Sequence, residues 1–476
     1  MTKRYENFIN AKPALPERRT YSPVIDPCTG EVFAEVAQSG PEDIDTAFTA
    51  ATQALPAWSA CTPAERQHLL LTIADVVEDN ADRLAGIESA NTGKPPVTTR
   101  TEEIDVAADV IRYFAGAARA TLTPAAGEYL SGHISYVLRE PVGVCAQMVP
   151  FNYPLLMAVW KLAPALAAGN TVVLKPSHNT PLSILEMAHL TAGYLPAGTV
   201  NIVCGDRDAT ADIVTHPAAR HVSATASTAS GIAIATAALS DVKRLHLGLG
   251  GKAPAIVFAD ADIFPTASSI AYAAFFNGGQ DCTAASRILV HAGIHDEFVA
   301  ALLEQVKAFT TGDPRDHPHV FYGPLNSRDQ VARIHRALDA VPVHAEIITP
   351  TEPLSTGGFF YPPTVVTGAV STDPIVAEEL FGPVVTVEQF TDEEQAVRIA
   401  NAAEYGLASS VHTNDHNTAM RVSAALNYGC VWINTHLPLA AEMPHGGFKR
   451  SGFGKDLSTY GLDEYTRIKH IMHAIQ

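Results

Sequence analysis

Apolar residues recur at helical spacing in two stretches of the first quarter of the chain. The first, residues 62–79, opens with Thr62 and Glu65, a pair that caps a helix because each side chain accepts a hydrogen bond from the other's backbone N–H. The second, residues 103–118, carries one apolar stripe. That stripe consists of Val106, Val110, Phe114 and Ala117. Both patterns predict amphipathic helices with one face against a core.

From residue 142 onward, short β-branched runs alternate with apolar stretches of helical length. The alternating segments are residues 142–149, 155–168, 171–174, 182–190 and 200–203, and further strand-like runs follow at 253–258, 288–291 and 384–390. Strands that alternate with helices predict parallel α/β sheets. Because 476 residues exceed the size at which one core keeps growing, we expect two or three domains.

Two segments interrupt this alternation, residues 121–141 and 455–476. In the first, Ile134, Tyr136 and Leu138 alternate with other residues, which is typical of a β-hairpin. A hairpin that leaves the body exposes unpaired strand edges, so we expect it to find a partner strand in another subunit.

Charge and cysteine content narrow the range of partners. The net charge is −18, from 32 Lys and Arg against 50 Asp and Glu, and no dense basic run occurs. Such a chain repels phosphate backbones and anionic lipid heads, so neither nucleic acid nor a membrane is an expected partner. The six cysteines lack paired spacing, the N-terminus lacks an apolar signal region, and no uncharged run is long enough to span a bilayer. We therefore expect free thiols and a cytoplasmic protein.

Two motif-like patterns predict nothing by themselves. Residues 248–253 fit only the loose GxGxxA form of the dinucleotide fingerprint, and they precede a predicted strand instead of following one. The pairs His291/His295 and His412/His416 have helical spacing, but no HExxH motif occurs, so we expect no metal site.

The clearest candidate for chemistry is Cys282. It follows Asn277, two glycines and Gln280, a composition that indicates an irregular backbone able to bring a thiol close to a ligand. A buried structural cysteine is the alternative, and this fragment alone leaves both interpretations open.

Motifs elsewhere in the chain favour a catalytic cysteine. Six segments, in this order and at these separations, resemble motifs of the aldehyde dehydrogenase superfamily. They are residues 150–154 (PFNYP), 174–177 (LKPS), 249–252 (LGGK), 279–282 (GQDC), 378–383 (EELFGP) and 444–447 (PHGG). The resemblance covers nearly the whole chain, and residues 279–285 and 442–447 are most similar to the branch of gamma-aminobutyraldehyde dehydrogenases.

The resemblance implies a fold and an assembly. A Rossmann-type dinucleotide-binding domain would comprise residues 1–120 and 142–248, and an α/β catalytic domain residues 249–440. The segments 121–141 and 455–476 would form a protruding β oligomerisation element of a homodimer or homotetramer.

The resemblance also implies catalytic roles. Cys282 would attack the aldehyde carbon, and the resulting thiohemiacetal would transfer hydride to the nicotinamide and leave a thioester. Asn152 would donate its amide N–H to the developing alkoxide beside the backbone N–H of Cys282. A turn-capping asparagine is the alternative for Asn152.

For the cofactor, the resemblance implies contacts with NAD or NADP. Lys175 would bind the adenosine ribose, Glu379 the nicotinamide ribose, and Phe381 would flank the nicotinamide. Other positions of the same matched site are Ser177, His178, Ser227, Gly231 and Gly250. NAD-preferring relatives often carry glutamate where this chain has His178, so the choice of cofactor stays open with a lean toward NAD.

The chain departs from the family pattern at Gly248, where the family ordinarily has the glutamate that acts as general base. Asp456 matches a second acidic position and could relay a proton through water. Loss of the base should chiefly slow thioester hydrolysis. Two alternatives remain: transfer of the acyl group to coenzyme A, and a cofactor-binding paralogue with little turnover.

The expected substrate is an aldehyde that carries an ammonium group, such as 4-aminobutanal. Tyr153 and Asp281 adjoin the two catalytic candidates, and Asp105, Asp109 and Tyr113 lie on the helix that borders the substrate tunnel in relatives. Carboxylates and aromatic faces suit a cation. Solvated helix aspartates and a hydrogen-bonded Asp281 are the alternative interpretation.

Overall fold

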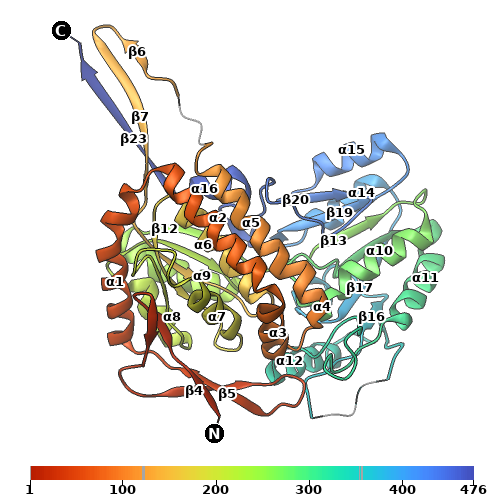
Figure 1. Cartoon of the computed structure of the whole chain (residues 1–476). Coiled ribbons are helices and arrows are strands. Elements are labelled where there is room, and N and C mark those ends of the chain that lie inside the picture. Colours follow the sequence, from red (N-terminus) through yellow and green to blue (C-terminus); the bar gives the residue numbers. More distant parts are fainter. Residues whose placement is uncertain (1, 121–123, 353, 355–356, 476) are drawn as a thin grey trace.

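The computed structural model describes residues 2–120, 124–352, 354 and 357–475. Residues 121–123 of the predicted hairpin segment and residue 476 of the final segment lie outside the described part. Two α/β bodies stand side by side, and a β arm extends from the first body (Figure 1).

The first body is built on a sheet whose central strands are parallel. The central strands are β8 (Val144–Met148), β9 (Thr171–Lys175), β10 (Val200–Ile202), β11 (Ala219–Thr225) and β12 (Arg244–Gly248). Antiparallel strands close both edges: β22 (Gly452–Phe453) beside β12, and β2 (Asn7–Ile9) with β3 (Lys12–Ala14) beside β10. The alternation of strands and helices from residue 142 is thus confirmed.

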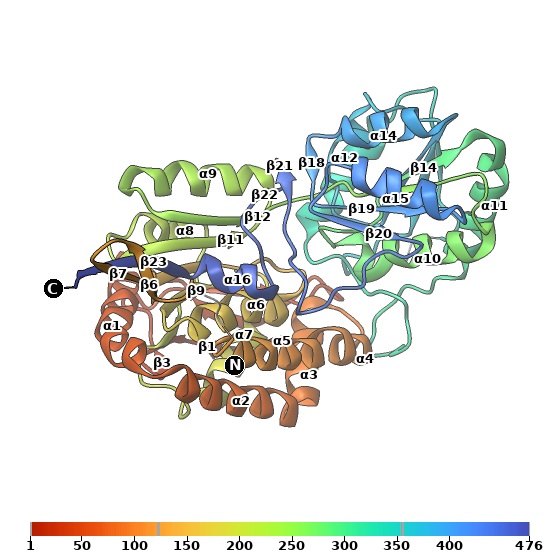
Figure 2. The ribbon, with the colours of Figure 1, turned by 90° about the horizontal axis from the view of Figure 1, so that it is seen from above.

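Both faces of this sheet are buried, which explains its continuously apolar strands. In β9, Val172 and Leu174 pack into one core cluster and Val173 into another, because successive side chains point to opposite faces. The first cluster lies under α2 (Pro63–Asp79), α3 (Ala81–Thr92), α5 (Asp105–Ala117), α6 (Pro154–Ala167) and α7 (Leu182–Thr191). The second lies under α1 (Pro41–Ala60), α8 (Arg207–Thr215) and α9 (Thr228–Ala238), and Figure 2 shows these layers from above.

The two predicted N-terminal helices are confirmed. Thr62 and Glu65 form the expected reciprocal cap of α2. A π-helical turn (Arg100–Ile104) precedes α5, whose Val110 and Phe114 are buried while Val106 is 36% exposed. The later residues of the apolar stripe of α5 therefore pack into the core, whereas its first residue, Val106, lies at the surface.

The second body contains a sheet in the order β15 (Glu346–Ile348), β16 (Thr364–Thr367), β17 (Val384–Phe390), β14 (Arg287–His291), β13 (Pro254–Val257), β19 (Ala408–His412) and β20 (Cys430–Ile433). All pairs are parallel except β15 with β16. Its helices are α10 (Ile263–Phe275), α11 (His295–Ala308), α12 (Arg328–Asp339), α14 (Glu393–Asn401) and α15 (His416–Ala425). The three predicted strands of this half are confirmed.

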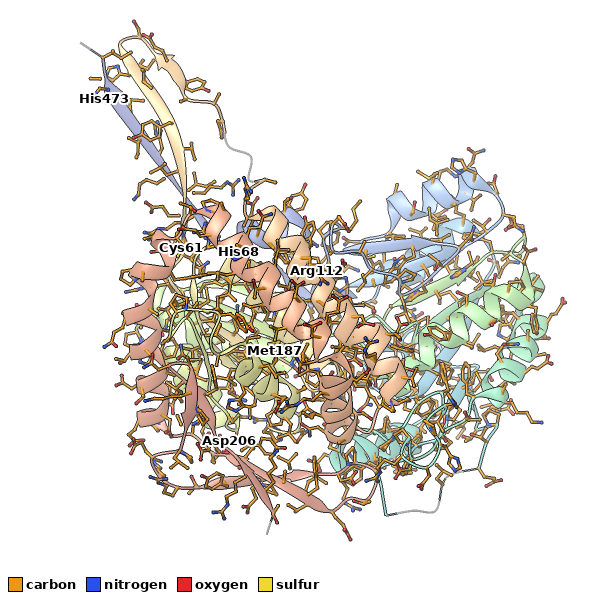
Figure 3. All side chains as sticks on the ribbon, viewed as in Figure 1. Cys61, His68, Arg112, Met187, Asp206 and His473 are labelled. Atoms are coloured by element: carbon orange, nitrogen blue, oxygen red, sulfur yellow. The ribbon has the colours of Figure 1, made fainter. Side chains whose placement is uncertain are left out.

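The arm consists of β6 (Gly127–Leu130), β7 (His133–Pro141) and β23 (Thr466–Ala474), joined in antiparallel pairs. The predicted hairpin is confirmed, but the expectation of a partner strand from another subunit is wrong for β7. Its second partner, β23, comes from the same chain and carries His473 near the outer end of the arm (Figure 3). The helix α16 (Ser458–Glu464) leads into β23.

Short elements complete the fold. These are a small sheet of β1 (Lys3–Tyr5), β5 (Val32–Ala37) and β4 (Tyr21–Ile25), the pair β18 (Tyr405–Gly406) and β21 (Phe448–Lys449), and the helices α4 (Pro96–Thr99) and α13 (Pro374–Ala377). A search of the described helices for one both long and apolar enough to cross a bilayer finds none.

Candidate active site

A cavity of about 1390 Å³ is lined by residues of both bodies. Its wall includes the turn after β8, the start of α9, the turn that follows α10, and the segments around residues 379–381 and 436–445. The sequence-predicted residues on this wall are Asp105, Asp109, Asn152, Tyr153, Lys175, Ser177, His178, Ser227, Gly250, Asp281, Cys282, Glu379 and Phe381. Residues far apart in the sequence are therefore brought to one site.

Four predicted residues do not line the cavity: Tyr113, Gly231, Gly248 and Asp456. Gly231 instead lets α9 pack closely, because a Cβ there would lie 2.3 Å from Leu249 Cδ2. The sequence-based statement that residues 248–253 do not follow a strand is wrong, since β12 ends at Gly248. No helix follows β12, and the next strand is β13, so the motif still lacks the dinucleotide fingerprint's context.

The turn before Cys282 has the irregular backbone that its composition predicted. Asn277, Gly278 and Gly279 have φ angles of 52°, 61° and 67°, and a Cβ on Gly279 would lie 2.2 Å from Gly382 O. Only glycine tolerates such an approach at positive φ. The turn ends with Cys282 partly exposed on the cavity wall as a free thiol, so the geometry favours a reactive cysteine over a structural one.

The other cysteines are placed differently. Cys28, Cys145 and Cys204 are buried, and none of the remaining described cysteines lines this cavity. Cys61, which is partly exposed, follows α1 near the base of the arm (Figure 3).

Asn152 is tied to the cysteine turn. Its Nδ2 donates to Gln280 O at 2.9 Å, and its backbone oxygen accepts from Lys94 Nζ at 2.8 Å. Lys94 is itself buried between Glu88 and Glu103, with Nζ 3.4 Å and 2.5 Å from their carboxylates. The sequence gave no signal for this ionic cluster. It fixes the backbone of the Asn152 loop through the hydrogen bond from Lys94.

The charges around the thiol are mainly negative. Burial raises the pKa of Cys282 well above its ordinary value, and the charges of Asp281 and Glu379 raise it further. The protein alone therefore favours the thiol form, and a positively charged group brought into the cavity would favour the thiolate.

The cofactor candidates lie in one part of the cavity. Glu379 Oε1 accepts from the Gly251 backbone N–H at 2.8 Å, and a Cβ on Gly250 would lie 2.1 Å from Glu379 Oε2. Burial raises the pKa of Glu379 to about 7. Lys175 Nζ donates to Gly205 O at 2.8 Å, and burial lowers its pKa to about 8.

The phosphate and nicotinamide candidates line the same cavity. Ser227 caps α9 and accepts from Ser230 N, and the methyl group of Ala226 also lies on the wall. Phe381, at φ 61°, packs edge-on against Phe151 at 5.6 Å. The cavity thus contains a glycine that leaves room for a carboxylate, a helix N-terminus and a buried lysine. Together these features fit a dinucleotide.

Further acidic and aromatic side chains line the same cavity. The acidic residues are Asp105, Asp109, Glu102 and Glu442. The last two were not predicted as site residues, although Glu442 opens the matched segment 442–447. Aromatic side chains on the same wall are Tyr153, Trp160, Tyr272 and Phe276.

Asp281, in contrast, is committed to hydrogen bonds within the protein. It accepts from Tyr153 Oη at 2.7 Å and from the backbone and hydroxyl of Thr283, each at 2.7 Å. The hydrogen-bonded interpretation of Asp281 is thus confirmed. Tyr113 lies off the wall, and the charge of Glu442 contributes to its raised pKa after burial.

A cavity that joins a cysteine, an amide donor and a dinucleotide-sized cleft defines a class of protein: dehydrogenases with a thiol nucleophile and a nicotinamide cofactor. The chain belongs to the aldehyde dehydrogenase family, whose model matches residues 15–471.

Similar proteins carry consistent descriptions. The chain is 42% identical to an aldehyde dehydrogenase of Emericella nidulans over 96% of this chain and 93% of that protein. It is 39% identical to a betaine aldehyde dehydrogenase of Bacillus subtilis, over 98% of this chain and 96% of that protein. A solved betaine aldehyde dehydrogenase from Staphylococcus aureus in complex with NAD+ superposes with a TM-score of 0.96 at 35% identity, covering 99% of this chain and 95% of that one. The predicted superfamily, fold and use of a nicotinamide cofactor are confirmed.

Proposed function

We propose that this enzyme oxidises a positively charged aldehyde, such as 4-aminobutanal or betaine aldehyde, to its acid with NAD+. The observation that carries the proposal is the four-carboxylate, aromatic wall that shares one cavity with Cys282. Carboxylates and aromatic faces attract both a primary ammonium group, as in 4-aminobutanal, and a quaternary one, as in betaine aldehyde. Relatives described as betaine aldehyde dehydrogenases support this substrate class.

Cys282 is the proposed nucleophile and Asn152 the proposed side-chain donor of the oxyanion hole. Sulfur attack on the carbonyl carbon places charge on oxygen, where an amide N–H and the Cys282 backbone N–H can stabilise it. Bound nicotinamide supplies the hydride acceptor and a positive charge near the thiol. Lys175, Ser177, Ser227, Gly250, Glu379 and Phe381 are the proposed cofactor contacts, and the lean toward NAD follows the NAD+ complex of a relative.

The domain boundaries predicted from the sequence are part of this proposal. Residues 1–120 and 142–248 would bind the dinucleotide, residues 249–440 would carry the nucleophile, and the arm would serve assembly into a homodimer or homotetramer. The exposed apolar side chains of the arm, Tyr129 at 70% and Ile468 at 67%, support an assembly role.

Rapid mixing of enzyme, aldehyde and cofactor tests the proposal. With NAD+ and cationic aldehydes, we expect a burst of about one reduced nicotinamide per site, followed by steady turnover, and a weaker response to butanal, to a carboxy-aldehyde and with NADP+. Cys282→Ala should abolish the burst, whereas Cys61→Ala, outside the cavity, should keep it. Equal rates for neutral and cationic aldehydes would contradict the substrate class.

The same assay separates the two alternatives. A burst that stalls and resumes on addition of coenzyme A would indicate acyl transfer. The absence of any burst with every aldehyde and both cofactors would indicate a cofactor-binding paralogue and overturn the proposed function.

A further inference from the structure

His436 lies where the cavity wall meets the turn that carries Cys282. It follows the end of β20 and opens the wall segment, residues 436–442, all of which line the cavity. Its Nε2 lies 2.7 Å from the carbonyl oxygen of Thr283, the residue after Cys282. Because a carbonyl oxygen can only accept, Nε2 carries the hydrogen. The ring therefore joins the wall segment directly to the backbone beside the proposed nucleophile.

The other ring nitrogen of His436 is fixed by two polar side chains of β19. Nδ1 lies 2.8 Å from Ser410 Oγ, and Ser410 Oγ lies 3.1 Å from His412 Nε2. Since Nδ1 accepts from the Ser410 hydroxyl, that hydroxyl accepts in turn from the N–H of His412. All three side chains are at most 4% exposed. The hydrogen bonds of this chain therefore all run from β19 toward Thr283.

Burial keeps both imidazoles neutral. It lowers the pKa of His436 to about 4 and the pKa of His412 to about 3. The carbonyl of Thr283 and the charge of Asp281 oppose this change in the pKa of His436, but burial outweighs them. A neutral imidazole has one N–H and one acceptor nitrogen, so the order of donors and acceptors is fixed at neutral pH.

The backbone on both sides of His436 has an uncommon conformation. Asn434 and Leu437 have φ angles of 55° and 86°, a region that a branched side chain such as leucine rarely adopts. Asn434 is joined to Thr413 by two hydrogen bonds of 3.0 Å, one to its Oδ1 from the Thr413 N–H and one from its Nδ2 to the Thr413 carbonyl. Such conformations persist only where the surrounding contacts fix them. The fold therefore specifies where His436 is placed.

Cys282 lies between two hydrogen-bonded points of its turn. On the N-terminal side, Asn152 Nδ2 donates to Gln280 O at 2.9 Å. On the C-terminal side, His436 donates to Thr283 O. The first donor follows β8 of the first body, and the second follows β20 of the second body. The direction of the Cys282 sulfur and backbone N–H thus depends on a residue from each body.

We propose that His436 is a positioning residue for thiol attack: its N–H to Thr283 O holds the Cys282 turn against the wall segment. The sulfur and the backbone N–H of Cys282 are thereby aligned on an aldehyde bound at that wall. His436 acts through the backbone of the turn, and the inference rests on the proposed function. The alternative role for the ring is an aromatic contact with the substrate, which needs no N–H.

Rapid mixing of the full-length enzyme with NAD+ and a cationic aldehyde separates these roles. His436→Phe keeps a planar ring without the N–H and should slow the burst about 10²-fold, as expected when a reacting group is displaced by about 1 Å. His436→Gln should recover most of that rate, because its amide supplies an N–H near the position of Nε2. Affinity for NAD+, measured by equilibrium titration, should stay unchanged in both variants, since Lys175 and Glu379 are intact.

Two further variants complete the test. Ser410→Ala removes the hydroxyl that fixes Nδ1 and should slow the burst about three- to tenfold, the usual contribution of one hydrogen bond. His221→Phe is the matched control, because His221 is also buried but its ring nitrogens have no hydrogen-bond partner among the described residues. Its burst rate should equal that of the unmodified enzyme.

Three results would overturn the inference. They are an unchanged burst rate in His436→Phe, an unchanged burst rate in Ser410→Ala, and a burst in His436→Gln that is as slow as in His436→Phe or slower. If His436→Phe does not fold, the burst rates of Ser410→Ala and His436→Gln decide: a slowed Ser410→Ala supports the inference, and a 10²-fold loss in His436→Gln contradicts it. An unmodified enzyme that shows no burst with any aldehyde would contradict the proposed function instead.

Discussion

The two sides of the nucleophile are built differently. On one side, Asn152 donates to the Cys282 turn and Gly251 donates to Glu379. A Cβ on Gly279 or Gly250 would lie only 2.2 Å or 2.1 Å from a neighbouring oxygen, so both positions require glycine. On the other side, around Gly248 and Asp456, polar atoms are buried at 3.5–3.6 Å from each other without hydrogen bonds. The first side follows the family pattern, and the second departs from it.

The departure from the family pattern at Gly248 therefore concerns one half of the reaction, the cleavage of the thioester. Thiol attack and hydride transfer need a nucleophile, an oxyanion donor and cofactor contacts, and the first side contains the proposed nucleophile Cys282, the proposed donor Asn152 and the proposed ribose contact Glu379. Thioester cleavage needs a base and a water, and the position at which the family ordinarily has its base, residue 248, is on the second side. A change at residue 248 can therefore alter hydrolysis while leaving the first half-reaction intact.

The largest effect is expected from breaking the first side at Asn152. Asn152→Ala removes one donor of the proposed oxyanion hole and should slow the burst about 10²–10³-fold, because the developing alkoxide loses a preorganised N–H. Rapid-mixing measurement of reduced nicotinamide checks this. Gln38→Ala, a polar substitution away from the cavity, is the control. A burst rate within about twofold of the unmodified enzyme would show that Asn152 only caps its turn.

A smaller effect, of opposite sign, is expected on the second side from Gly248→Glu. The new carboxylate adds a base, so steady-state turnover should rise about tenfold with little change in the burst. A general base usually contributes about 10²–10⁴-fold, but a smaller gain is expected here because the new carboxylate and that of Asp456, 3.6 Å from a Cβ at residue 248, repel each other. Gly248→Gln, of similar size without a charge, should give no gain. Unchanged turnover in Gly248→Glu would mean that hydrolysis is not limited by a missing base.

The sequence predicted the first side better than the second for a physical reason. The residues around Cys282 and Glu379 depend on backbone conformation, and glycines packed closely against another segment of the chain leave a recognisable local pattern in the sequence. The ionic cluster of Lys94, Glu88 and Glu103 was not predictable, because it joins residues whose neighbours carry no chemical signal. The approach of His246 Nε2 to Asp456 Oδ2 at 3.5 Å was not predictable for the same reason, because the two residues are 210 positions apart in the chain.

The fold was predictable at a similar level. A strand that is buried on both faces, such as β9, is continuously apolar, and this composition alone predicts a parallel sheet. The pairing of β7 with β23 of the same chain was not predictable, because an alternating strand specifies a partner but not which segment supplies it.

The smallest expected effect concerns the first side and follows from the titration of Glu379. Burial raises the pKa of Glu379 from 4.5 to about 7, so its carboxyl is largely protonated at pH 6 and ionised at pH 8. Ribose hydroxyls donate better to the ionised form, and affinity for NAD+ should therefore rise up to about tenfold across this range, with release of a proton. Equilibrium titration of NAD+ binding against pH measures it.

The linked effect on stability has a definite sign. Between pH 4.5 and about 7 the folded chain binds more protons at Glu379 than the unfolded chain, so the free energy of unfolding without cofactor falls as pH rises through this window. Glu379→Gln should flatten both the binding curve and this part of the stability curve. Glu378→Gln, at an exposed neighbouring carboxylate outside the cavity wall, should flatten neither. A pH-dependent NAD+ affinity that survives in Glu379→Gln would place the titrating group elsewhere, with Lys252, whose pKa burial lowers to about 7, the next residue to replace.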